Sequence, residues 1–185
     1  MSRVLASRAL ICHPATPCAA LVAVGARIAQ TKDFGWEVMF VAVGTPGELA
    51  LPVAAPRVHT DELWRTTCFE LFLACGEDAY AEINLSPSGA FAAYHFDHYR
   101  TGMRPIPLPA PEIALDVGSE RMTLTARLGE DCLPWDGTGR LGIAAVIEEA
   151  VSGRISYWAL AHPPGKPDFH HRDCFALTLP PLSAA

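Results

Sequence analysis

Proline and glycine punctuate this chain along almost its whole length, and this spacing is the strongest constraint on its fold. The 185 residues include 16 prolines and 14 glycines, which divide the sequence into short apolar segments. A helix does not tolerate such frequent interruption, whereas strands joined by turns require it. We therefore expect an all-β chain with little helix.

The apolar segments between these turn signals are the predicted strands. They are Ala9–His13, Ala20–Ala29, Trp36–Val43, Cys68–Ala74, Tyr80–Ser86, Ala90–Tyr99, Ile113–Val117, Met122–Leu128, Leu141–Glu148, Ile155–Ala161 and Cys174–Leu179. Many short strands of this kind are typical of an antiparallel β-sandwich, immunoglobulin-like or jelly-roll-like, with about 10–11 strands. We expect residues 1–185 to form a single domain of this class.

Two segments need a separate interpretation. Residues 141–151 (LGIAAVIEEAV) also suit a helix, because Ala and Glu favour one. We prefer a strand, since Ser152-Gly153 then turns the chain into Arg154–Leu160. Residues 104–111 (RPIPLPAP) must be extended because of their prolines, and we expect them to cross the surface between two sheets.

Charge and cysteine content narrow the classes of partner. The chain has 20 acidic against 14 basic residues, a net charge of −6, which argues against nucleic acid and anionic membranes as partners. We find no apolar stretch of about 18 residues to span a bilayer, and His13 and Pro14 interrupt the best leader candidate. The six cysteines form no CxxC pair, so we expect reduced thiols in a cytoplasmic protein. The oligomeric state stays open.

The stretch 68–99 allows three strands to be aligned residue by residue. Placing Ala74 opposite Tyr80, and closing the next hairpin with Pro87-Ser88-Gly89, puts Asn84 opposite Ala92. Gly89 suits the positive φ that the last position of such a loop requires. Alternation then gives a core face of Phe69, Leu71, Leu73, Ala81, Ile83 and Leu85. The opposite face carries Glu70, Phe72, Tyr80, Glu82, Asn84, Ser86, Tyr94 and Phe96.

This second face combines carboxylates, an amide and aromatic rings. Acid and amide oxygens accept pairs of sugar hydroxyls, while ring faces cover the C–H side of a sugar. The alternative is an ordinary solvent-exposed face, but such strands usually carry Lys, Thr or Arg, and this face has none. We predict a non-catalytic binding site for a carbohydrate or similar polyhydroxylated small molecule, with Glu70, Glu82, Asn84 and Tyr94 as contacts.

Two loops are candidates for the rim of this site. Trp64 either plugs the end of the sandwich or offers a stacking platform, and Arg65 pairs with Asp61 or Glu62 or reaches Glu70. The second loop lies within Tyr157–Asp173 (YWALAHPPGKPDFHHRD), where prolines stiffen a segment dense in ionisable groups. Its candidate contacts are Trp158, His162, Lys166, Asp168 and His170.

Three other functions remain open. A hydrolase or isomerase would use Glu70 and Glu82 with a loop histidine, although an open sheet face excludes water poorly. A metal carrier would use His162, Asp168 and one of the adjacent His170 and His171, which point to opposite sides of an extended chain. A haem carrier would use Met103 with His162. We lean towards no catalysis and no cofactor.

Residues 63–73 (LWRTTCFELFL) and 80–89 (YAEINLSPSG) resemble DOMON-like ligand-binding domains related to family 9 carbohydrate-binding modules. Residues 158–162 (WALAH) and 165–170 (GKPDFH) resemble a small bacterial branch of that group. The resemblance implies two antiparallel sheets with a ligand, a sugar or in some branches haem, on a concave face or at one end. It also implies that Trp64 and Trp158 stack on the ligand. Carbohydrate modules are usually secreted and attached to enzymes, whereas we expect this chain to be a cytoplasmic protein of one domain.

Overall fold

The computed structural model describes residues 2–33, 35–129 and 139–179. In order along the chain, its strands are β1 Arg3–Cys12, β2 Leu21–Gln30, β3 Trp36–Gly44, β4 Cys68–Ala74, β5 Tyr80–Leu85, β6 Phe91–Phe96, β7 Arg104–Pro105, β8 Glu112–Val117, β9 Arg121–Leu128, β10 Arg140–Glu148, β11 Ile155–Ala159 and β12 Leu177–Thr178. Every pairing between these strands is antiparallel. The predicted all-β antiparallel class is confirmed.

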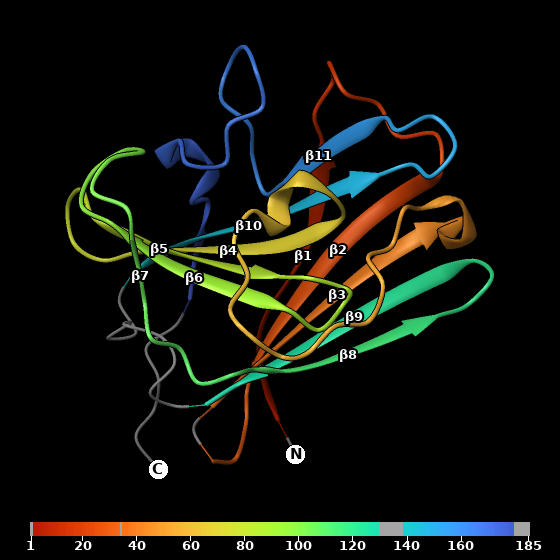
Figure 1. Cartoon of the computed structure of the whole chain (residues 1–185). Helices are drawn as coiled ribbons and strands as arrows, with labels where there is room; N and C mark the ends of the chain where they lie inside the picture. The colour runs from red at the N-terminus through yellow and green to blue at the C-terminus, as the bar shows by residue number, and fades with distance from the viewer. Residues whose placement is uncertain (1, 34, 130–138, 180–185) are drawn as a thin grey trace.

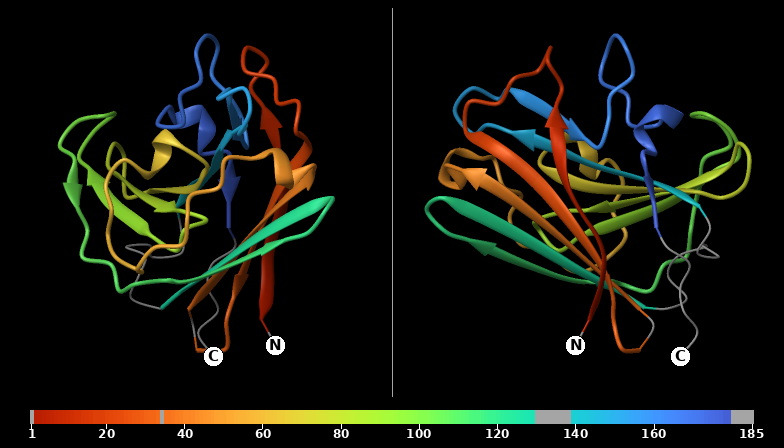
Figure 2. Two further views of the ribbon diagram at one scale, coloured as in Figure 1. Left: turned by 45° about the vertical axis from the view of Figure 1, so that its right-hand side comes forward. Right: turned by 180° about the vertical axis from the view of Figure 1, so that it is seen from behind.

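The strands belong to one continuous sheet that folds over on itself. Its order is β7-β6-β5-β4-β10-β11-β1-β2-β3-β9-β8, with β12 paired to β10. We call β1, β2, β3, β9 and β8 sheet A, and β7, β6, β5, β4, β10 and β11 sheet B. Strand β1 joins them, because its first part pairs with β2 while Ile11 and Cys12 pair with β11. Figures 1 and 2 show the two sheets as layers that diverge from this shared strand.

The main apolar core fills the space between the two sheets. Phe40 of sheet A and Phe69 of sheet B meet across it, with ring centroids 4.8 Å apart. The predicted core face of β4 and β5 points into this space, where Leu71, Ile83 and Leu85 are almost fully buried. Burying each such side chain stabilises the fold by about 1.5–3 kcal/mol.

The predicted alignment of β4, β5 and β6 is confirmed. Ala74 pairs with Tyr80, Glu82 with Tyr94 and Asn84 with Ala92. Gly89 closes the β5–β6 hairpin at a φ of 94°, the region of backbone space that only glycine enters without strain. The side chains of Glu70, Glu82 and Tyr94 consequently project from the same side of sheet B, away from the main core.

The two ambiguous segments are also settled. Residues 140–148 form strand β10, and the chain turns through Gly153 at a φ of 61° into β11, as expected. Residues 104–111 lead from β7 at the edge of sheet B to β8 at the edge of sheet A, which is the predicted crossover.

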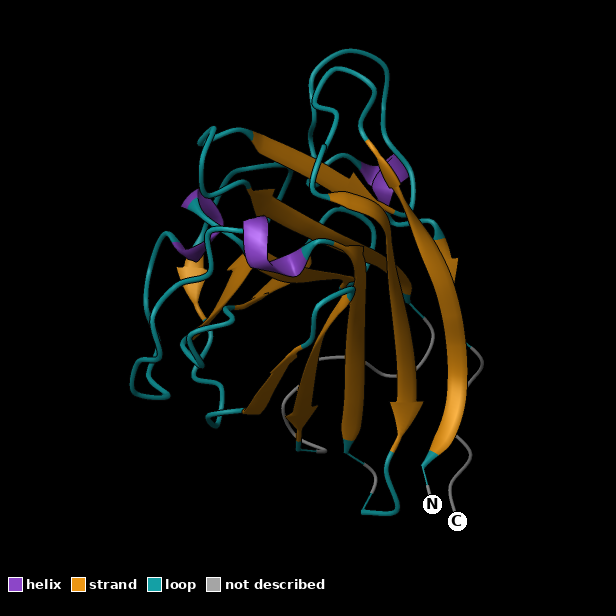
Figure 3. Ribbon diagram, turned by 90° about the vertical axis from the view of Figure 1, so that its right-hand side faces the viewer, coloured by secondary structure: helices purple, strands orange, loops and turns teal. Residues whose placement is uncertain are grey.

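The first strand was underestimated. We placed its start at Ala9, but β1 begins at Arg3 and only Ala6 and Leu10 of its residues are buried. Polar and charged residues between them face outward, which weakens the apolar signal of the strand. The helical segments are single turns (Figure 3), and within the described residues no helix is long and apolar enough to cross a membrane.

Candidate ligand-binding site

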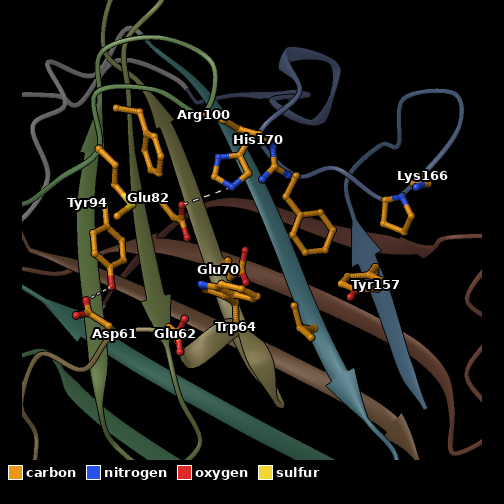
Figure 4. Close-up of a pocket in the computed structure, with 15 residues that line it drawn as sticks. Asp61, Glu62, Trp64, Glu70, Glu82, Tyr94, Arg100, Tyr157, Lys166 and His170 are labelled. Carbon is orange, nitrogen blue, oxygen red and sulfur yellow. Dashed lines mark hydrogen bonds and ion pairs between the residues drawn. The ribbon is translucent and has the colours of Figure 1, made fainter. Parts of the chain in front are cut away.

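The outer face of sheet B is covered at one end by the segment 163–175. Phe175 of this segment stacks on Phe72 with ring centroids 5.9 Å apart, and Phe72 and Tyr80 are buried beneath it. The rest of the face is left as a cavity of about 1020 Å³ (Figure 4). Its lining consists of Asp61, Glu62, Trp64, Glu70, Glu82, Tyr94, Phe96, Arg100, Met103, Val146, Tyr157, Lys166, Pro167, Phe169 and His170.

Two carboxylates form the floor of this cavity. Glu70 of β4 is 3% exposed and Glu82 of β5 is 5% exposed. The fully buried Asn84 donates its Nδ2 to Glu82 Oε1 over 2.7 Å, so it orients Glu82 from the side. Glu70 Oε1 has no hydrogen-bond partner among the described residues. Burial and the neighbouring Glu82 raise the pKa of Glu70 well above its usual value, and burial also raises the pKa of Glu82.

His170 reaches the same floor from the C-terminal segment. The Tyr80 hydroxyl accepts the Arg100 N–H at 3.2 Å and lies 2.7 Å from His170 Nδ1, so we assign Tyr80 as the donor to that nitrogen. This leaves the proton of His170 on Nε2, which lies 3.8 Å from Glu82 Oε2. Burial, reinforced by the nearby Arg100, lowers the pKa of His170 to about 4, so the ring is neutral at neutral pH.

Asp168 holds His170 in place without lining the cavity. Its carboxylate accepts from the Arg100 guanidinium at 2.8 Å, from the Tyr99 hydroxyl and from the His170 backbone N–H at 3.1 Å. Burial opposes ionisation here, but these donors keep the pKa of Asp168 below its usual value. The network ties the loop after β6 to the segment that carries His170.

Trp64 forms part of the rim, and Arg65 lies beside it on the same short helical turn, Leu63–Arg65. Trp64 lines the cavity and is 47% exposed, so it does not plug the sandwich. Arg65 pairs with Glu62 at 2.7 Å and lies over the Trp64 ring at 5.3 Å. Of the expected partners of Arg65, the structure therefore selects Glu62. Asp61 accepts a hydrogen bond from Tyr94 at 2.6 Å.

Five of the eleven predicted contacts do not line the cavity. Arg65, Asn84 and Asp168 lie next to it and pair with residues that do, whereas Trp158 and His162 lie elsewhere. Trp158 is buried in the main core, because its partner on β10, Ala145, faces inward, and Trp158 Nε1 donates to Ser156 Oγ at 3.1 Å. The neighbouring Tyr157 lines the cavity instead. His162 lies 2.8 Å from the Ile11 carbonyl and packs edge-on against His13, away from the cavity. Lys166 and His170 do line it.

The residues proposed for a metal or haem are not gathered at one point. The His170 side chain is 16% exposed and the His171 side chain 44% exposed, and both lie in a turn rather than on the extended chain that we expected. Met103 lines the cavity, but His162 does not. Within residues 2–33, 35–129 and 139–179 no group of three His, Cys, Asp or Glu side chains is arranged to hold a metal ion.

Several lining residues were not foreseen as contacts. Arg100 enters the site because a left-handed backbone turn, with a φ of 54°, directs it back towards Asp168. Phe169 and Val146 supply apolar wall, and strand parity alone could have identified Val146 once β10 was paired with β4. The loop residues carried no pattern that would have revealed their positions.

Comparisons with known proteins support the fold. No protein-family model matches the chain, and no curated protein matches it. A solved structure of a "putative carbohydrate-binding protein" from Bacteroides uniformis ATCC 8492 is similar, with a TM-score of 0.64 and 12% identity over 95% of this chain and 84% of that one. A family 9 carbohydrate-binding module from Caldicellulosiruptor kristjanssonii in complex with glucose matches with a TM-score of 0.43 and 12% identity, over 77% and 69% of the two chains. The first likeness shows a shared fold.

Proposed function

We propose that this chain is a non-catalytic binding protein for a sugar or a similar polyhydroxylated small molecule. The observation that carries the proposal is the cavity over sheet B, which combines buried acidic acceptors on its floor with aromatic rings on its walls. Its volume of about 1020 Å³ is ample for a small-molecule ligand.

Each part of the lining has a role in this proposal. Glu70 and Glu82 accept hydrogen bonds from ligand hydroxyls, while Lys166 and His170 Nε2 donate to ligand oxygens. Trp64 and Tyr157 cover the C–H faces of the ring. The site works because Asn84 fixes Glu82, and Asp168 fixes His170, before the ligand arrives.

The fold comparison is consistent with this role. The Bacteroides uniformis protein that shares the fold is itself described as a "putative carbohydrate-binding protein". At 12% identity the likeness supports only the architecture, so the argument for a sugar depends on the residues of the cavity.

Titration calorimetry against a panel of mono- and disaccharides tests the proposal. Trp64→Ala and Glu82→Gln should each weaken binding about tenfold or more, since losing one such contact costs about 1–3 kcal/mol. Val151→Ala, at a 97% exposed position in the β10–β11 turn, is the control and should bind like the wild type. Failure of every sugar to bind, or unchanged binding by both cavity variants, would contradict the proposal.

One observation favours a second candidate, a hydrolase or isomerase acting on a sugar. Glu82 and His170 face each other at 3.8 Å, and burial shifts the pKa of both, a pattern found at acid–base centres. Incubating the protein with sugars and aryl glycosides, followed by mass spectrometry, separates the two functions. Conversion that Glu82→Gln abolishes would establish the enzyme, whereas binding without conversion supports the binding protein.

A further inference from the structure

Glu70 is the most unusual group in the cavity. Glu70 is only 3% exposed, yet its Oε1 has no hydrogen-bond partner among the described residues. Its neighbours across the sheet are Ala144, which has no polar side chain, and Asn84, whose amide is committed to Glu82. Buried polar atoms are nearly always hydrogen-bonded. Because Glu70 lines the cavity, a molecule bound there is in a position to supply the missing partner.

The charge of the cavity indicates what kind of partner this is. The lining includes four carboxyl side chains, of Asp61, Glu62, Glu70 and Glu82, against the two cations Arg100 and Lys166. Arg100 is already paired with Asp168, and Figure 4 places Lys166 on the wall away from Glu70. Because Arg65 in turn pairs with Glu62, the acidic surplus lies with Asp61, Glu70 and Glu82. A neutral ligand would leave this surplus uncompensated, whereas a cationic one would balance part of it.

The rings of the cavity favour the same kind of ligand. Trp64, Tyr94 and Tyr157 line it together with Phe96 and Phe169. The face of an aromatic ring attracts a cation, by about 0.5–2 kcal/mol depending on how far the cation is desolvated. An ammonium group between such rings and a carboxylate is bound by both.

We infer that the ligand is an amino sugar, or a similar polyol with a free amine, whose ammonium group donates to Glu70 Oε1. This inference rests on the proposed function and names the ligand class of the same site. Glu82 Oε2, which faces His170 at 3.8 Å, is the second acceptor within the acidic floor.

The surroundings of Glu70 explain why an ammonium suits it better than a hydroxyl. The charged groups that act on Glu70 are Glu82 on β5 and Arg100 from the loop after β6. Cys68 lies on its own strand, Tyr94 and His170 line the same cavity, and the nearest side chains of β10, Ala144 and Val146, are apolar. Burial and Glu82 raise the pKa of Glu70, and Arg100 offsets this only in part. An ammonium ion would provide the Glu70 carboxylate with a cationic partner, and a charge-assisted hydrogen bond is roughly twice as strong as a neutral one.

The test compares glucosamine with glucose and N-acetylglucosamine by calorimetry at about pH 6, where a sugar amine carries its proton. We expect glucosamine to bind about tenfold more tightly than either neutral sugar, because each 1.4 kcal/mol corresponds to a factor of ten. Glu70→Gln, which keeps the size of the side chain, should weaken glucosamine binding more than glucose binding, so that the two sugars then bind within about threefold of each other. Glu112→Gln, an exposed acid on sheet A, is the matched control and should retain the preference.

The outcomes separate this inference from the proposed function. Equal affinities for glucose and glucosamine would overturn the amine inference and leave sugar binding intact. Binding of glucosamine and of a simple alkylamine, but of no neutral sugar, would support the Glu70 ammonium site and overturn the sugar function. If no sugar and no amine binds, both proposals fail. The wild-type comparison of the three sugars keeps the inference testable even if Glu70→Gln folds poorly.

Discussion

Replacing Glu70 by Gln should stabilise the protein at neutral and alkaline pH. The side chain is nearly fully buried beside Glu82, and its Oε1 lacks a partner among the described residues. An unpaired buried group costs about 1–3 kcal/mol, and more when it is charged, so ionisation of Glu70 beside a second carboxyl is unfavourable. Gln keeps the shape and removes the charge.

The pH dependence of the effect follows from the direction of the pKa shift. Burial and Glu82 raise the folded-state pKa of Glu70 above its ordinary value of 4.5. The folded protein therefore holds this proton more tightly than the unfolded chain, and stability declines as pH rises above 4.5 and through the folded-state pKa. The difference between variant and wild type should be small at about pH 4 and reach about 1–3 kcal/mol near pH 8.

Urea denaturation and thermal melting across this pH range measure the difference. For a chain of this length, about 1 kcal/mol corresponds to about 2–4 °C in Tm, so we expect the Glu70→Gln variant to melt about 2–12 °C higher near pH 8. Glu112→Gln should follow the wild type at every pH. A Glu70→Gln variant that is less stable near pH 8, or whose difference from wild type does not change with pH, would refute the reasoning.

Three further predictions concern other parts of the structure. In an NMR titration the ring of His170 should change protonation at about pH 4, and a midpoint near 6.5 would contradict the buried position. Because the unfolded chain binds this proton more tightly, the contribution of His170 to folding stability should decline as pH falls from 6.5 through about 4. In a Trp135→Phe background, Trp64→Phe should remove the fluorescence that acrylamide quenches, because Trp36 and Trp158 are buried, and strong residual quenching would contradict the assignment. Gly89→Ala should cost about 1 kcal/mol or more in urea denaturation because of its φ of 94°, whereas Gly47→Ala, with open space around it, should cost less.

The centre of the site could be predicted because two independent signals agree there. Along β4 and β5, aliphatic residues alternate with polar or aromatic ones, so only registers of one parity bury Leu71 and Ile83 together. Gly89 then sets the length of the next loop and with it the pairing of Glu82 with Tyr94. A shift of one residue would have turned every side chain to the other face.

The remaining lining residues, on β11 and in the loops, could not be predicted because there neither clear strand alternation nor a loop-setting glycine is present. Strand β11 (ISYWA) has large apolar or aromatic residues at both parities, so its sequence does not indicate which side faces inward. Pairing with β10 decides the matter and buries Trp158 while exposing Tyr157 to the cavity. Arg100 and Asp168 meet from loops 68 residues apart in the chain, and no local pattern encodes such a contact.

The separation of the two faces of sheet B has a consequence for how such a protein can evolve. Residues 70, 82 and 94 face the cavity, whereas their immediate neighbours Leu71, Ile83 and Ala93 belong to the interior between the sheets. Mutation of the first set can therefore change the proposed binding site while the second set continues to maintain the fold. Each strand therefore carries two sets of residues under separate selection, and the cavity-facing set can change without replacement of the core-facing set.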